Sequence, residues 1–142
     1  MVIYLSADKD GQDLKNFIKS YLEENNYEVQ DLTKEPADDF VEAANLLVEK
    51  INENDDSVGF IIDAHGAGSF MAANKHKEIV AAEVSDEWSA YMTRRHNNAR
   101  IITLGSQIVG NGLAENIVKA FVETDYDGGR HQVRVDMLNA MC

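Results

Sequence analysis

Hydrophobic and polar residues alternate along this chain in two distinct patterns. Five short apolar runs have the length and composition of buried strands, and they cover residues 2–5, 27–32, 58–62, 79–84 and 101–104. The stretches between and after these runs carry apolar residues at spacings of three and four, which is the helical period. These stretches predict helices over 11–25, 40–51, 66–75, 110–122 and from about 130 onward, with one more beginning after Ser85.

The regular alternation of strands and helices predicts an α/β fold. We expect a single Rossmann-like domain over residues 1–142, in which a five-stranded parallel sheet has helices on both faces and a helix follows at the C-terminal end. Ligands of such sheets bind at the carboxyl ends of the strands, where the strand order reverses. The loops after Leu5, Ile62, Val84 and Leu104 are therefore the first places to look for a site.

Local signals predict where two of the helices begin and which way one of them faces. Asp38 or Asp39 is expected to cap the second helix, and Ser85 is expected to cap the helix after the fourth strand. On that later helix, Trp88 and Tyr91 are expected to face the core.

Charge and composition exclude several classes of function. The net charge is −12 and the 13 Lys and Arg residues form no basic stripe, so nucleic acid is an unfavourable partner. No apolar run approaches the roughly 18 residues that a membrane span needs, and no signal peptide is recognisable, so we expect a cytoplasmic protein without a membrane partner. The single cysteine, Cys142, cannot form a disulfide within the chain, which suits a reducing compartment.

Two of the predicted loops carry polar groups or glycines that could bind a ligand. Asp8 and Lys9 follow the first strand, where they could contact a sugar hydroxyl and a phosphate, although the loop taken alone favours helix capping by Asp8 or Asp10. Gly66 and Gly68 lie between the third strand and a helix, where backbone N–H groups can face an anion. Met71 stands where a dinucleotide-binding fingerprint would have its third glycine, so that motif is excluded.

The cationic residues gather at two later positions. Arg94 and Arg95 precede His96, and they can either complement a helix dipole or flank an acid–base histidine. Arg130 and Arg134 are four residues apart after a Gly-Gly pair, so they share a helical face and can act as a phosphate clamp or as a solvated surface. The histidines show no metal-ligand spacing, and we expect no metal ion.

Taken together and in order, five segments resemble one family. They are residues 6–11, 66–75, 89–99, 104–110 and 128–135, with the motifs Ala-Ala-Asn-Lys, Arg-His-Asn-Asn and Gly-Gly-Arg-His-x-x-Arg. In this order they resemble the type B ribose-5-phosphate isomerase and galactose-6-phosphate isomerase (LacAB) family. The resemblance implies a metal-free, cofactor-free aldose–ketose isomerisation through a cis-enediolate.

The resemblance assigns roles to residues in the second half of the chain. The family's ring-opening histidine falls on His96, with Asn97 beside it, and the phosphate-binding arginines fall on Arg130 and Arg134.

It assigns further roles to the loops after the first and third strands. The family's first-loop aspartate falls on Asp8, and Lys9 stands where a histidine is common. The backbone amides that bind the enediolate fall in the loop 64–68, at His65, Gly66, Ala67 and Gly68.

The chain departs from the family at the residue that transfers the proton. Asp63 stands where many members have a catalytic cysteine, and Ser69 stands where others have a catalytic glutamate. Gln107 replaces a third arginine that is common in the family. Because family sites lie between two subunits, the departures imply a hetero-oligomer in which a related LacB subunit supplies the base for converting D-galactose 6-phosphate to D-tagatose 6-phosphate.

Two other interpretations stay open. The first is a homomeric ribose-5-phosphate-type isomerase that uses Asp63 as its base. The second is a non-catalytic sugar-phosphate sensor that has kept the phosphate clamp.

Overall fold

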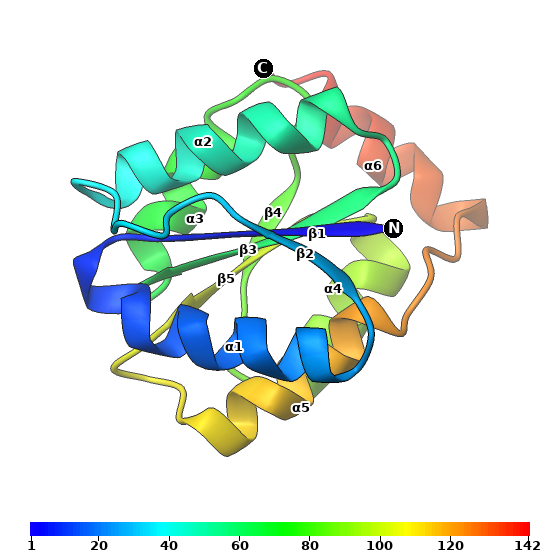
Figure 1. Ribbon diagram of the computed structural model, residues 1–142. Helices are drawn as coiled ribbons and strands as arrows, with labels where there is room; N and C mark the ends of the chain where they lie inside the picture. Colours follow the sequence, from blue (N-terminus) through cyan, green and yellow to red (C-terminus); the bar gives the residue numbers. More distant parts are fainter.

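Five parallel strands form one sheet in the computed structural model, which describes residues 1–142 (Figure 1). The strands are β1 (Val2–Ala7), β2 (Glu28–Asp31), β3 (Ser57–Asp63), β4 (Ala81–Glu83) and β5 (Ile101–Gly105). Their spatial order is β2-β1-β3-β5-β4, and every pair is parallel. The chain moves from β1 outward to β2 and then continues on the other side of β1 from β3 onward. The order therefore reverses between β1 and β3, and the loops after these two strands flank the reversal.

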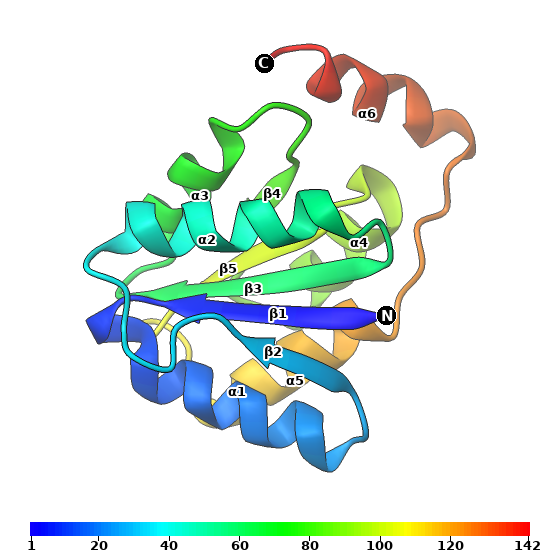
Figure 2. The same cartoon turned by 45° about the horizontal axis from the view of Figure 1, so that its top comes forward.

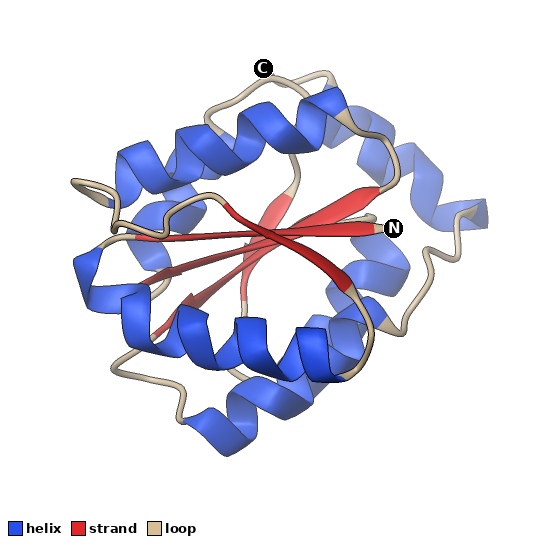
Figure 3. Cartoon of the chain, in the orientation of Figure 1, coloured by secondary structure: helices blue, strands red, loops and turns tan.

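Helices cover both faces of the sheet, as Figure 3 shows. They are α1 (Gln12–Glu24), α2 (Phe40–Glu53), α3 (Ala67–Asn74), α4 (Glu87–Asn97), α5 (Asn111–Val122) and α6 (Gln132–Asn139), with 3-10 turns η1 (Lys9–Gly11) and η2 (Gly129–His131). Helices α1, α4 and α5 pack on one face and α2 and α3 on the other, while α6 lies apart from both layers (Figure 2). The predicted α/β fold with a five-stranded parallel sheet is confirmed.

Two hydrophobic layers hold the sheet between its helices. The layer under α1, α4 and α5 contains 18 buried residues, and the layer under α2 and α3 contains 11. Every residue of β3 is buried, because this strand lies in the middle of the sheet and is covered on both faces. That double coverage explains why the strand reads as a continuous apolar run in the sequence rather than as an alternating one.

The helix caps match the expectation at one helix and correct it at another. Asp39 caps α2, and its carboxylate accepts a hydrogen bond from the N–H of Glu42 at 2.8 Å. Asp86, not Ser85, caps α4, with its carboxylate accepting from the N–H of Ser89 at 2.7 Å. Both residue types are good caps, but a carboxylate also gains from the positive end of the helix dipole.

The prediction that Trp88 faces the core is wrong. Its side chain is 67% exposed, and the residues that α4 turns inward are Ala90 and Thr93. Trp88 instead packs on Tyr91, with ring centroids 5.5 Å apart, on the outer side of the helix. Small residues face the sheet here because α4 and α5 share the space above it.

None of the helices has the length and hydropathy needed to span a bilayer.

Candidate functional site

The loop after β3 is organised by a buried carboxylate. Asp63 ends the strand and is 5% exposed. Its carboxylate accepts a hydrogen bond from the hydroxyl of Ser69 at 2.8 Å and a longer one from the N–H of Ser69 at 3.3 Å. A buried charge is tolerated only when it is hydrogen-bonded in this way. The side chain therefore ties the first turn of α3 to the end of β3.

Gly66 is favoured by the backbone conformation of this loop, and Gly68 leaves room for a neighbouring ring. Gly66 has φ of 77° and caps α3 without a side-chain hydrogen bond, a conformation that favours glycine. A Cβ atom at Gly68 would lie 2.8 Å from the ring of Phe40. Because Asp63 takes the N–H of Ser69, the N–H groups of Ala67 and Gly68 are the ones left at the start of the helix to face a ligand. The loop thus has the form of an anion-binding turn.

Asp8 lies beside this loop and adds negative charge to it. Its carboxylate caps η1 by accepting from the N–H of Gly11 at 3.1 Å, so the capping interpretation of this residue is confirmed. Partial burial raises the pKa of Asp8, the N–H of Gly11 lowers it, and the charges of Asp63 and Asp10 raise it again. Lys9 is exposed. The carboxyl edge of the sheet therefore combines the free N–H groups at the start of α3 with several carboxylates.

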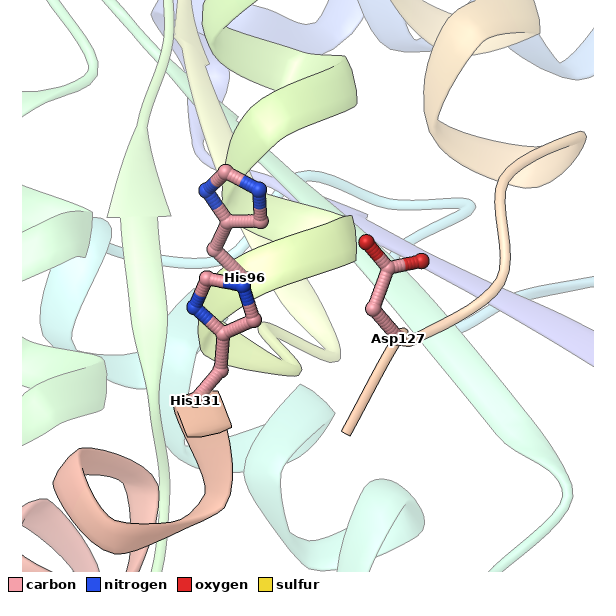
Figure 4. Close-up of side chains that lie close together, drawn as sticks. All are labelled: His96, Asp127 and His131. Atoms are coloured by element: carbon pink, nitrogen blue, oxygen red, sulfur yellow. The ribbon is translucent and has the colours of Figure 1, made fainter. Parts of the chain in front are cut away.

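His96 lies at the end of α4 and is stacked on His131. The two rings are nearly parallel, with centroids 4.1 Å apart and an angle of 11° between their planes. The carboxylate of Asp127 lies to one side of the pair, as Figure 4 shows. The N–H of Asp127 donates to the carbonyl of Arg95 at 3.0 Å, and the Arg95 guanidinium pairs with the Asp127 carboxylate at 2.7 Å. These contacts fix the segment after α5 against the end of α4.

Cationic side chains surround this histidine pair. The pKa of His131 is lowered, first by loss of solvent contact and then by the charges of His96, Arg130 and Arg134. Both arginines therefore lie near the stacked rings, although Arg130 belongs to η2 and only Arg134 to α6. Both are exposed, as a phosphate clamp requires.

Asn97 is exposed at the end of α4. Its side-chain amide donates to the hydroxyl of Thr93 at 3.1 Å. It borders a groove of about 450 Å³ that also includes Leu138 and Met141 of the C-terminal segment. This groove does not reach the loop 64–68.

The two groups of residues lie at opposite edges of the sheet. The loops after β1 and β3 share the carboxyl edge, whereas α4 and α5 run back and end at the amino edge, where His96 and η2 lie (Figure 1). The seven residues of β3 span roughly 20 Å at about 3.3 Å per residue. A sugar phosphate is shorter than this distance. Within one chain, the stacked histidines and the glycine loop therefore cannot contact the same substrate molecule.

Sequence reasoning missed three residues of these clusters. His131 and Asp127 contact or flank His96 from a segment about thirty residues away, so no short spacing reveals them. One nitrogen or oxygen from each of His96, Asp127 and His131 lies within 4.8 Å of the others. Such an arrangement can hold a metal ion, which the spacing of the histidines in the sequence does not predict. The sequence marks Ser69 only as a position where some family members have a catalytic glutamate. It does not reveal that the Ser69 hydroxyl donates a hydrogen bond to Asp63.

Comparison with known proteins gives consistent matches over the whole chain. The model of the Ribose/Galactose Isomerase family matches residues 3–138. The chain is 61% identical over 142 residues to galactose-6-phosphate isomerase subunit LacA 2 of Streptococcus pyogenes serotype M1. It is 59% identical over 142 residues to galactose-6-phosphate isomerase subunit LacA of Streptococcus mutans. Both matches cover this chain and the relative in full.

Two solved structures that this chain resembles are ribose-5-phosphate isomerases. The ribose 5-phosphate isomerase of Thermotoga maritima has a TM-score of 0.94 at 32% identity, covering 99% of this chain and 98% of the other. Ribose-5-phosphate isomerase B of Mycoplasma genitalium, with bound ribulose 5-phosphate, has a TM-score of 0.92 at 34% identity, covering 98% of this chain and 94% of the other. The family match and these full-length relatives show that the chain belongs to the Ribose/Galactose Isomerase family.

Proposed function

We propose that this chain is one subunit of a cytoplasmic hetero-oligomeric isomerase that converts D-galactose 6-phosphate to D-tagatose 6-phosphate together with a LacB subunit. Residues 1–142 act as one isomerase domain. The proposal is supported by full-length relatives that are LacA subunits of galactose-6-phosphate isomerase. The observation that carries it is the separation of the two residue groups across the sheet. A site that needs both groups has to be completed by a second subunit.

In this proposal, the amino edge of the chain binds and opens the sugar. Arg130 and Arg134 hold the phosphate, because guanidinium groups donate several hydrogen bonds to phosphate oxygens. His96 transfers a proton at the ring oxygen, and Asn97 orients the open chain. The phosphate contacts supply binding energy far from the carbon atoms that react. His131 supports the His96 ring by stacking on it.

The proton transfer between C2 and C1 then falls to a base from LacB. Asp63 is a poor candidate for that base in this chain, because both of its hydrogen-bonding contacts face Ser69 and its side chain is buried. In our proposal Asp63 anchors the loop instead. The amides of Ala67 and Gly68 face an anion that binds at the carboxyl edge of the sheet. An enediolate oxygen is such an anion.

The test is an isomerase assay of the purified chain with and without LacB. We expect little or no conversion of galactose 6-phosphate by the chain alone, and turnover when LacB is added. Comparable turnover by the chain alone would contradict the proposal and favour a homomeric isomerase that uses Asp63. Sugar-phosphate binding without turnover, even with LacB present, would favour the sensor.

A further inference from the structure

The side chains of His96, His131 and Asp127 converge from three separate segments. His96 lies in the last turn of α4, Asp127 lies between α5 and η2, and His131 belongs to η2 (Figure 4). One ligating atom of each side chain lies within 4.8 Å of the other two. We propose that these three residues form a binding site for a single Zn²⁺ ion, and that zinc and sugar phosphate exclude one another there.

The backbone holds the three ligands close together before any ion binds. The N–H of Asp127 donates to the carbonyl of Arg95 at 3.0 Å, which fixes the carboxylate beside the end of α4. Gly128 and Gly129 have φ of 64° and 57°, and these left-handed residues turn the chain back toward the helix. The stack between the two imidazoles then sets their separation. Binding therefore does not require a loop to fold.

The ligand set selects the kind of cation. Two imidazole nitrogens and one carboxylate oxygen, with a fourth position open to water, are a common ligand set for Zn²⁺ in open sites. Mg²⁺ and Ca²⁺ prefer sites made of oxygen atoms alone. Zinc–nitrogen bonds of about 2.0–2.1 Å require ligand atoms about 3.3 Å apart in a tetrahedron. Closing from 4.8 Å needs a tilt of the stacked rings, which the partial exposure of His96 and His131 allows.

Nearby charges limit the affinity. Arg95 pairs with one oxygen of Asp127, Oδ2, at 2.7 Å, and leaves Oδ1 for an ion. The charges of Arg130 and Arg134, which lie close enough to act on His131, oppose a cation. We therefore expect zinc binding in the micromolar range rather than the tight binding of a structural zinc site.

Exclusion of the substrate follows from the shared ligand, and this part rests on the proposed function. A zinc ion on His96 occupies the nitrogen lone pair that ring opening needs. Zinc should therefore inhibit turnover reversibly, and raised galactose 6-phosphate should weaken that inhibition.

Binding is measured on the full chain without a histidine tag, by calorimetric titration with Zn²⁺ and by the visible absorption of bound Co²⁺. We expect one ion per chain, and an affinity that falls at least tenfold in His131→Gln and in Asp127→Asn. His76→Gln and Cys142→Ser are the matched controls, because His76 contacts Asn45 and is not one of the three converging residues, and Cys142 is the exposed thiol. Thermal unfolding of each variant verifies that it is folded.

Three results would overturn the site: no zinc binding below millimolar concentration, unchanged affinity in both ligand variants, or an equal loss in either control. These readouts need no turnover, so their failure leaves the isomerase proposal intact. Conversely, if the chain binds zinc but shows no isomerase activity with LacB, the site stands and the proposed function fails. In an active complex with LacB, zinc inhibition that raised galactose 6-phosphate does not weaken would contradict the mutual exclusion of zinc and substrate.

Discussion

Replacing Ser69 with alanine removes the hydroxyl that donates to the Asp63 carboxylate at 2.8 Å. The carboxylate keeps only the longer contact with the Ser69 N–H, at 3.3 Å, in an environment where Asp63 is 5% exposed. A hydrogen bond to a charged group contributes about 1.5–3 kcal/mol, and water cannot replace it at a buried site. We expect Ser69→Ala to lower the free energy of unfolding by about that amount.

The chain contains a matched control for this substitution. Ser89 donates its hydroxyl to Asp86 at 2.8 Å and its N–H to the same carboxylate at 2.7 Å, but this pair is exposed. The two serines therefore have the same pair of contacts and differ in burial. Water replaces the lost hydroxyl at the surface, so Ser89→Ala should change stability by less than about 0.5 kcal/mol.

Urea unfolding of the isolated chain, at one fixed protein concentration, measures both changes. The slope of the transition should stay constant while the midpoint falls for Ser69→Ala. For a chain of this size the same loss corresponds to a drop in melting temperature of about 5–10 °C. Equal effects of the two substitutions, or a change below about 0.5 kcal/mol for Ser69→Ala, would refute the role of Asp63 as a buried loop anchor.

Three further predictions concern binding, pH and backbone strain. Arg130→Ala and Arg134→Ala should each raise the Michaelis constant of the assembled enzyme about ten- to a hundredfold, and an unchanged constant would make both arginines ordinary surface residues. The raised pKa of Asp8 means that the folded chain binds its proton more tightly than the unfolded chain, so this residue's contribution to stability falls as pH rises above 3.8. The stability of Asp8→Asn, measured relative to the parent by thermal unfolding, should therefore increase between about pH 4 and pH 7. A stability difference that stays the same across this pH range would contradict the prediction. Gly66→Ala should lower the free energy of unfolding by about 1–2 kcal/mol because Gly66 has a positive φ. Gly112→Ala in α5 should instead raise it by up to about 1 kcal/mol, and equal shifts in melting temperature would exclude backbone strain at Gly66.

The sheet was predictable from the sequence because its central strands are buried on both faces. The run over 58–62 corresponds to β3, since no alternation with solvent interrupts it. The run over 79–84 contains the shorter edge strand β4, Ala81–Glu83, where pairing on only one side ends the strand early. Trp88 was misplaced because periodicity identifies the apolar stripe of a helix but not whether a neighbouring helix leaves room for a large ring.

The candidate site was predictable in part. Local sequence patterns predict three features: the carboxylate of the first loop, the glycine turn and the pair of arginines. The resemblance to a family identifies His96. The stack of His96 on His131 depends on how the segment after α5 returns to α4, which no local pattern encodes. The partnership of Asp63 with Ser69 was also hidden, because a serine six residues after an aspartate has no distinctive pattern in a sequence.

The most direct test of the account compares His96→Asn with Asp63→Asn in the complex with LacB. If this chain contributes the ring-opening edge, His96→Asn should slow turnover by about 10²–10⁴-fold, the usual contribution of a general acid–base group. Asp63→Asn disturbs a buried contact with Ser69 and can lower stability, but it should leave the turnover of the assembled complex within a few-fold. Size-exclusion chromatography verifies that both complexes assemble. A large loss of turnover in an intact Asp63→Asn complex, beside a small loss for His96→Asn, would contradict the account.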